Sequence, residues 1–242
     1  MSNGTGNRAE KGGIFMNLSL RTIRLCERKF GKGGFWGFDP AEEADFDALT
    51  QEDAGEELDT LLEGGLAELV NDEIRFSALG HHIFNMMTRP EQFLCLSNEA
   101  DRICVRIYIR NAYYLFLGED RMVAAHEDRG RFTLELLPNL DQVIGSFVYA
   151  LRRKHSADGE AASSTPEFTV EGRDFDSEGV VLSELTVFGR YEGDDVSMSL
   201  KKTDETEAAV FREADCDISA LINSVTSWLF ERFAKSYERE GS

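Results

Sequence analysis

Few of the residue types that perform chemistry lie close enough together in this sequence to indicate a catalytic site. The nearest approach to a metal-binding set is the adjacent pair His81 and His82 with Cys95 and Cys104. Neighbouring residues on a helix point about 100° apart, so the two histidines cannot easily share one ion. We interpret these side chains as packing or surface residues. The sequence therefore predicts no metal site and no catalytic residues.

The glycine-rich segment 31–38, GKGGFWGF, contains glycines and a lysine but lacks the spacing of a phosphate-binding loop, and we interpret it as a turn. It carries three aromatic residues, Phe35, Trp36 and Phe38. A glycine-rich turn cannot bury three rings by itself, and aromatic side chains anchor protein interfaces. These three are the candidate partner-binding residues, and the alternative is that they pack onto the sheet.

Other catalytic signatures are missing: there is no GxSxG, no P-loop and no GxGxxG after a strand. We expect a protein that is not an enzyme and uses no cofactor. An enzyme without a recognisable motif stays an alternative.

The formal charge of −19 opposes binding to polyanions such as nucleic acid and anionic lipid. Residues 39–74 contain 14 Asp or Glu and no Lys or Arg. We interpret this acidic run as a solvated face, with a docking surface for a basic partner as the alternative. A basic cluster precedes it, formed by Arg21, Arg24, Arg28, Lys29 and Lys32.

The sequence shows no signal for export or for membrane insertion, and we therefore expect the protein to be in the cytoplasm. The stretch 1–11 is polar and has no apolar core, and the apolar-rich run 218–230 is too short to span a bilayer. The four cysteines, Cys26, Cys95, Cys104 and Cys216, form no regular framework and fit reduced thiols. We expect a cytoplasmic protein that does not insert into a membrane.

The segment 16–90 reads as a small helical unit. Residues 16–30 fit either a strand or a short helix, and apolar residues recur at helical spacing from 39 to the glycines at 64–65. A short helix at 66–70, a turn at 71–72, a short strand at 74–76 and a helix from 78 to Pro90 follow. This order is typical of winged-helix units.

After Pro90 the pattern changes to strands. Alternation and turn residues predict an antiparallel meander of four strands, at 102–109, 113–117, 122–125 and 132–136. Pro138 begins a helix. A polar linker follows at 154–167, and then strands at 180–191, 196–201 and 208–212 and a helix at 217–237.

The two meanders and their helices have the same order. Apolar positions in the helix after residue 138 recur 78 residues later with the same spacing, and one position is polar. We predict an α+β fold with two meander-plus-helix halves related by a pseudo-twofold, whose strands form one continuous antiparallel sheet. The predicted division is a disordered leader (1–15), the winged-helix-like unit (16–90), the first half (91–153), the linker (154–167) and the second half (168–242), with everything after residue 16 in one compact domain.

This layout resembles the EspG-like chaperones of type VII (ESX) secretion. The resemblance covers most of the chain after residue 40: the segment 65–69 (GLAEL), the strands of 102–136, the helix after Leu137 and Pro138, and the repeated pattern at 180–237. It implies a cytoplasmic chaperone that holds a helical secretion substrate before export and uses no cofactor. The chain is shorter than the mycobacterial members. A winged-helix-like transcriptional regulator is the alternative, although the acidic charge of 39–74 disfavours binding to DNA.

Overall fold

The computed structural model describes residues 15–30, 34–38, 51–98, 103–111, 113–120, 131–137, 142, 167–192, 195–204, 207–216, 223 and 225–228. Its helices are α1 (Leu20–Phe30), α3 (Gln51–Glu63) and α4 (Ala78–Thr88). The strands are β1 (Phe15–Ser19), β2 (Ala67–Val70), β3 (Glu73–Phe76), β4 (Gln92–Asn98), β5 (Ile103–Arg110), β6 (Tyr113–Asp120), β7 (Arg131–Leu137), β8 (Glu167–Phe175), β9 (Val181–Glu192), β10 (Asp195–Asp204) and β11 (Glu207–Cys216).

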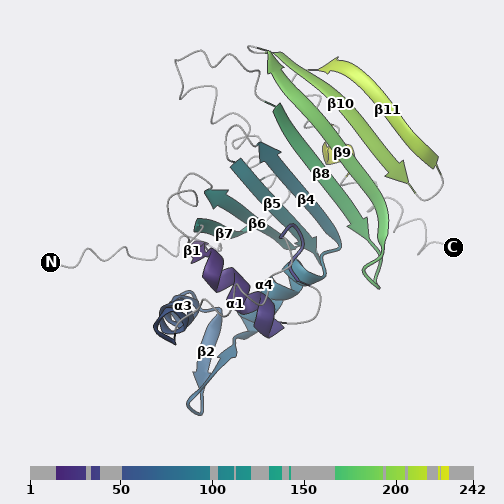
Figure 1. Cartoon of the computed structure of the whole chain (residues 1–242). Helices are drawn as coiled ribbons and strands as arrows, with labels where there is room; N and C mark the ends of the chain where they lie inside the picture. The colour runs from purple at the N-terminus through teal and green to yellow at the C-terminus, as the bar shows by residue number, and fades with distance from the viewer. Residues whose placement is uncertain are drawn as a thin grey trace.

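Nine of the described strands form one antiparallel sheet, in the order β1-β7-β6-β5-β4-β8-β9-β10-β11 (Figure 1). The first meander runs from β4 to β7 and the second from β8 to β11. They join through their first strands, because β4 pairs antiparallel with β8, with Leu94 opposite Gly172. The prediction of an α+β fold with one continuous antiparallel sheet is confirmed.

The strand predictions of the two meanders need two corrections. The first meander begins at β4, whose span was not predicted as a strand, and β6 pairs directly with β7. The predicted strand 122–125 lies outside the described residues. β8 was also missed, although Phe168 and Val170 alternate with Thr169 and Glu171 as in a half-buried strand.

The helices expected after each meander lie mostly outside the described residues. Only residues 142, 223 and 225–228 of these segments are described, and they are helical. Two antiparallel meanders joined through their first strands have the order that a twofold axis between β4 and β8 would produce. The equivalence of the two halves stays a prediction. Residues 1–14 of the predicted leader and 154–166 of the predicted linker also lie outside the described part of the chain, and their last residues, Phe15 and Glu167, are instead the first residues of β1 and β8.

The N-terminal segment is both strand and helix. β1 pairs with β7 and ends at Ser19, whose hydroxyl accepts a hydrogen bond from the Thr22 backbone N–H at 2.9 Å and so caps α1. The Ser19 and Thr22 hydroxyls both donate to the buried carboxylate of Glu57 on α3, which ties the two helices together. The predicted helix is confirmed over 51–63, and residues 39–50 lie outside the described part.

A short hairpin, β2-β3, projects from the helices away from the large sheet (Figure 1). Its turn residues Asn71 and Asp72 both have positive φ, 52° and 62°, which suits a two-residue turn between twisted strands. α4 follows directly, capped by the Ser77 hydroxyl, which accepts from Gly80 N at 3.0 Å. The predicted turn, short strand and helix are confirmed. The short helix predicted at 66–70 is wrong, because the turn at 71–72 folds this segment back as β2 onto β3. The resemblance to a winged-helix unit stays a prediction.

The large sheet has an apolar cluster on each face. Alternation along β4 places Phe93 against α1, α4 and the loop 34–38, and Leu94 on the opposite face with Trp228 of the segment 225–228. The helix-covered cluster contains Ile23, Phe84 and Leu134, among others. The opposite cluster extends across the junction of the meanders, because it includes residues of β4, β5, β8 and β9.

Candidate functional site

The aromatic residues predicted to bind a partner lie in a loop, 34–38, that is packed against the sheet. Phe35 is 3% exposed and its ring stacks on Phe84 with centroids 5.8 Å apart. Trp36 is half-buried against Phe175 at 4.6 Å. Phe38 is half-buried against Phe132 at 5.6 Å.

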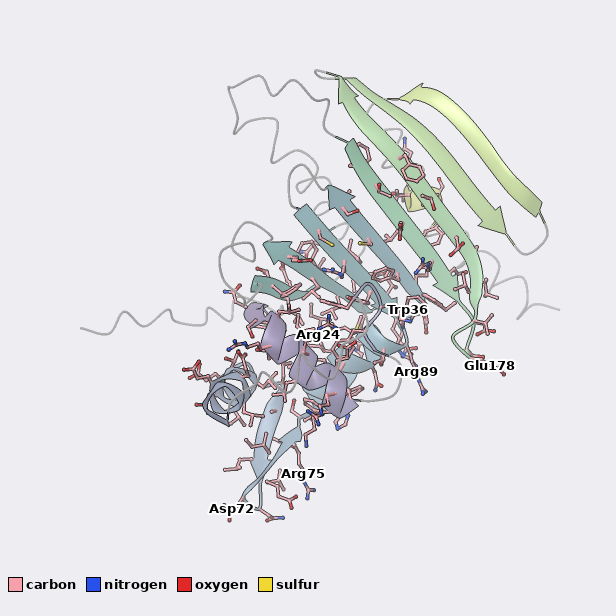
Figure 2. All side chains as sticks on the ribbon, in the orientation of Figure 1. Arg24, Trp36, Asp72, Arg75, Arg89 and Glu178 are labelled. Atoms are coloured by element: carbon pink, nitrogen blue, oxygen red, sulfur yellow. The ribbon has the colours of Figure 1, made fainter. Side chains whose placement is uncertain are left out.

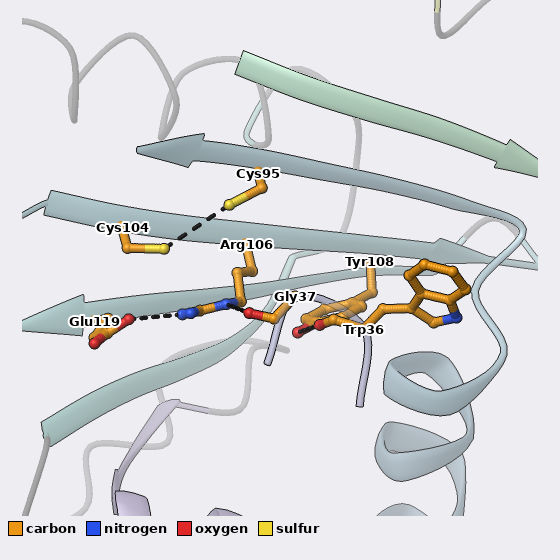
Figure 3. Close-up of polar contacts among 7 residues, drawn as sticks. All are labelled: Trp36, Gly37, Cys95, Cys104, Arg106, Tyr108 and Glu119. Atoms are coloured by element: carbon orange, nitrogen blue, oxygen red, sulfur yellow. Dashed lines mark hydrogen bonds and ion pairs between the residues drawn. The ribbon is translucent and has the colours of Figure 1, made fainter. Parts of the chain in front are cut away.

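Hydrogen bonds hold the backbone of this loop at both ends. The Glu27 carboxylate accepts from Phe35 N at 3.1 Å, and the Met87 carbonyl accepts from Trp36 N at 3.0 Å. The buried Tyr108 hydroxyl donates to the Trp36 carbonyl at 2.8 Å (Figure 3). Burial raises the pKa of Tyr108, so its hydroxyl keeps the proton that it donates. The loop is therefore fixed through its main chain, independently of its rings.

Arg106 on β5 is the central contact of the loop. Its Nε donates to the Gly37 carbonyl at 2.8 Å, and its Nη1 forms an ion pair with Glu119 on β6 at 2.9 Å (Figure 3). The guanidinium lies 4.3 Å from the centroid of the Phe38 ring, within the range of a cation–π interaction. Glycine is required at position 37, because φ is 79° and a Cβ atom would lie 2.6 Å from the Phe93 ring.

The structure thus places the three candidate residues, and their contact with a partner stays a prediction. Phe35 has almost no surface to offer. Trp36 and Phe38 keep a partial exposure, and the Arg173 guanidinium lies 5.5 Å from the Trp36 ring. The alternative interpretation, in which the rings pack onto the sheet, describes Trp36 and Phe38, whereas Phe35 packs on helix α4.

A more exposed apolar surface lies on the β2-β3 hairpin. Leu69 and Ile74 are directly opposite each other and are 62% and 42% exposed. The pair Ala67 and Phe76, two positions nearer the base on the same face, reaches the core. The hairpin therefore carries its apolar face from the core out into solvent. We call Leu69 and Ile74 the hairpin pair.

Sequence reasoning missed the hairpin pair, although a signal was present. The turn at 71–72 was recognised, and pairing the flanking residues around it places Leu69 opposite Ile74. What the sequence does not show is that the strands end so soon and that no other described element covers them. Asp72 and Arg75 mark the free end of the hairpin in Figure 2. Other large apolar residues with exposed surface are Tyr113, Val180, Val181 and Phe188.

The titratable groups near the helices serve packing. The thiol of Cys26 is buried, and burial, together with the nearby Glu57 carboxylate, raises its pKa, so it is protonated and a poor nucleophile at neutral pH. His81 packs against Phe30 at 5.4 Å, and His82 packs against Tyr113 at 4.6 Å. Within the described residues, no three His, Cys, Asp or Glu side chains gather in a group that would hold a metal ion.

Two further observations concern membrane-spanning helices and similarity to known proteins. Among the helices that the structure describes, none combines the length and apolar character needed to cross a membrane. No protein-family model matches the chain, and a search of the curated proteins finds no significant match.

Proposed function

We propose that this protein is a cytoplasmic adaptor or chaperone that binds another protein, and that its partner is a helical substrate of type VII (ESX) secretion held before export. The observation that carries the proposal is the hairpin pair. Two large apolar side chains stand opposite each other on a projecting hairpin, where burial by a partner would remove them from water.

The architecture supports the proposal in a second way. The order of a helical unit, a meander, a polar linker and a second meander is the layout on which the resemblance to EspG-like chaperones rests. The hairpin projects from the helical unit, which shares an apolar cluster with the first meander. A support that is already ordered lowers the entropy that a binding surface loses when a partner docks.

The charge of the hairpin region suits a polypeptide better than a phosphate backbone. Exposed acidic residues surround the hairpin pair, among them Glu68, Asp72 and Glu73, and Arg75 is already paired with Glu73 at 2.6 Å. α4 has no Lys or Arg with which to neutralise phosphates. We therefore propose no binding to nucleic acid.

Co-expression tests the proposal. The chain is produced with each small helical-hairpin protein encoded near its gene, and complexes are measured by size-exclusion chromatography with light scattering. We expect a stable complex with one of them. Leu69→Asp and Ile74→Asp should each weaken it at least about tenfold, because a charge replaces a buried apolar contact.

Val180→Asp is the matched control, since Val180 is equally exposed but lies in the turn between β8 and β9. It should leave the affinity unchanged. Absence of a complex with every candidate substrate, or equal losses in all three variants, would contradict the proposal. A gel shift with duplex DNA at low salt, where electrostatic binding is strongest, would point to the regulator instead.

A further inference from the structure

Two cysteines on neighbouring strands are in contact beside the loop-anchoring arginine. Cys95 on β4 and Cys104 on β5 have their Sγ atoms 3.8 Å apart (Figure 3). In the register of the two strands, Cys95 is opposite Arg106 and Cys104 is opposite Ser97, so the cysteines form a diagonal pair on one face of the sheet. Neither is in a disulfide, and Cys104 is buried while Cys95 is partly exposed.

We infer that Cys95 and Cys104 are a reversible oxidation site that closes into an intramolecular disulfide linking β4 to β5. The S–S bond is about 2.05 Å long, so the sulfur atoms must approach by less than about 2 Å from their contact distance. Diagonal partners on neighbouring strands are about 7–8 Å apart, so closure needs side-chain rotation together with a shift of the β4 and β5 backbones toward each other. The co-substrate is a peroxide or a low-molecular-weight disulfide.

The chemistry with a peroxide has two balanced steps. The Cys95 sulfur attacks a peroxide oxygen, the O–O bond breaks, and Cys95 becomes a sulfenic acid while one water leaves. The Cys104 sulfur then attacks the Cys95 sulfur, the S–O bond breaks, and a second water leaves with the proton of Cys104. The two sulfurs are together oxidised by two electrons and the peroxide is reduced.

The surroundings assign the roles of the two thiols. Cys95 meets the oxidant because it is the more exposed, and Cys104 resolves the intermediate from within the sheet. The Arg106 guanidinium faces Cys95 and favours the anionic sulfur. The hydrogen bond to Cys104 and burial act more strongly and raise the pKa of Cys95, so we expect slow oxidation rather than the fast exchange of a catalytic dithiol.

A metal ion bridging the two sulfurs is the competing interpretation of the contact. Glu171 is opposite Cys95 across the β4-β8 pair. No group of three suitable ligands is found around this pair among the described residues, and the Arg106 cation would oppose a metal cation there. The contact therefore favours covalent chemistry.

Peptide mapping of the full-length protein tests the inference. Trypsin places all four cysteines in separate peptides, 25–28, 76–102, 103–106 and 213–232, because cleavage after Arg102 separates Cys95 from Cys104 and the bond before Pro90 resists cleavage. After treatment with hydrogen peroxide or oxidised glutathione, we expect 76–102 to be joined to 103–106 in the monomer. Dithiothreitol should release both peptides.

Two variants control the result. Cys104→Ala removes the resolving thiol, so oxidised glutathione should leave a stable mixed disulfide on Cys95, whereas in the native chain Cys104 displaces the glutathione. Cys26→Ala should leave the cross-link unchanged. If Cys104→Ala fails to fold, mapping of the native chain decides alone. Unlinked peptides with Cys95 overoxidised or glutathionylated, or a link only between two molecules or only in denaturant, would overturn the inference.

Discussion

The two meanders pair their strands in the same way but differ on the face that carries the aromatic loop. On this face the first meander presents buried apolar side chains, including Phe93, Tyr108 and Leu134, beneath α1, α4 and the loop. Directly across the junction, the second presents Thr169, Glu171, Arg173, Glu184 and Thr186, and the ring of Phe188 is 56% exposed. Figure 1 shows the described helices α1, α3 and α4 on the side of β1 and β4–β7.

This difference shows that the pairing of strands and the burial of a sheet face are determined separately. The backbone order of each meander needs only alternation and short turns. Whether a face is buried depends on what lies against it, and an antiparallel sheet tolerates one solvated face. Among the described residues, Glu171, Glu184 and Phe188 are exposed on this face of β8 and β9, and only the end of β8 is covered, where Phe175 is buried against Trp36. The same face of β4 to β7 packs under the helices and the loop.

The largest expected effect comes from truncating a ring beneath the helices. Phe84→Ala should lower the free energy of unfolding by about 4 kcal/mol, because this buried ring contacts Phe30, Phe35 and Phe76 and its loss leaves a cavity. Urea unfolding followed by circular dichroism measures the change.

Phe188→Ala is the control on the second meander, and it should change stability by less than about 0.5 kcal/mol. Equal losses in the two variants would mean that the open face of the second meander is buried in solution, and the comparison would fail.

An Arg–Glu pair occurs on the same face of each meander, and the second prediction compares the two. Arg106→Met should cost about 3 kcal/mol, since it leaves the Glu119 carboxylate and the Gly37 carbonyl without their buried donor. Arg173→Met removes a solvent-exposed partner of Glu184 and should cost less than about 1 kcal/mol.

Added salt separates the two cases further. The small contribution of Arg173 should fade in high salt, because exposed pairs are screened, whereas the cost of Arg106→Met should persist. A salt-sensitive loss in Arg106→Met would mean that the loop 34–38 does not exclude water from this ion pair.

The third prediction tests the opposite face of the second meander. Gly172→Ala should cost about 2 kcal/mol, because the added Cβ would lie 2.9 Å from the Trp228 ring and 3.1 Å from Leu94. Gly55→Ala is its control: nothing lies within 4 Å of that position on α3, and alanine should stabilise the helix by about 0.5 kcal/mol. If the free energy of unfolding of Gly172→Ala were unchanged, residues 225–228 would not pack against the sheet at this position.

The sequence predicted the elements whose residues alternate or repeat regularly. β5, β9 and α4 were recognised because their apolar residues have period 2 or 3.6, and the turn at 71–72 because of its residue types. β4 and β8 were missed, although they form the junction of the sheet and the residues of β8 also alternate. Strand 92–98 follows Pro90 without clear alternation, since apolar residues occupy both of its faces.

The candidate site was predicted less well, for a physical reason. The sequence identified the aromatic loop, but its anchors belong to three different elements, and all except Glu27 are far from it along the chain: Met87, Arg106 and Tyr108. Exposure of the hairpin pair and contact between Cys95 and Cys104 likewise depend on tertiary placement. No local pattern reports such placement.

The smallest effect concerns the hydrogen bond that joins the first meander to the loop. Tyr108→Phe removes the donor to the Trp36 carbonyl and should cost about 1 kcal/mol at pH 7, with Tyr113→Phe, an exposed position, as the control. Because burial raises the pKa of folded Tyr108, the unfolded chain loses this proton first as pH rises above about 10. Above this pH the native chain therefore loses the stability that comes from its protonated Tyr108, whereas Tyr108→Phe has no such contribution to lose. Urea unfolding should show that the two proteins differ less in their free energy of unfolding above pH 10 than at pH 7. A constant difference would mean that water reaches the hydroxyl and that the loop lies less tightly on the first meander than the structure shows.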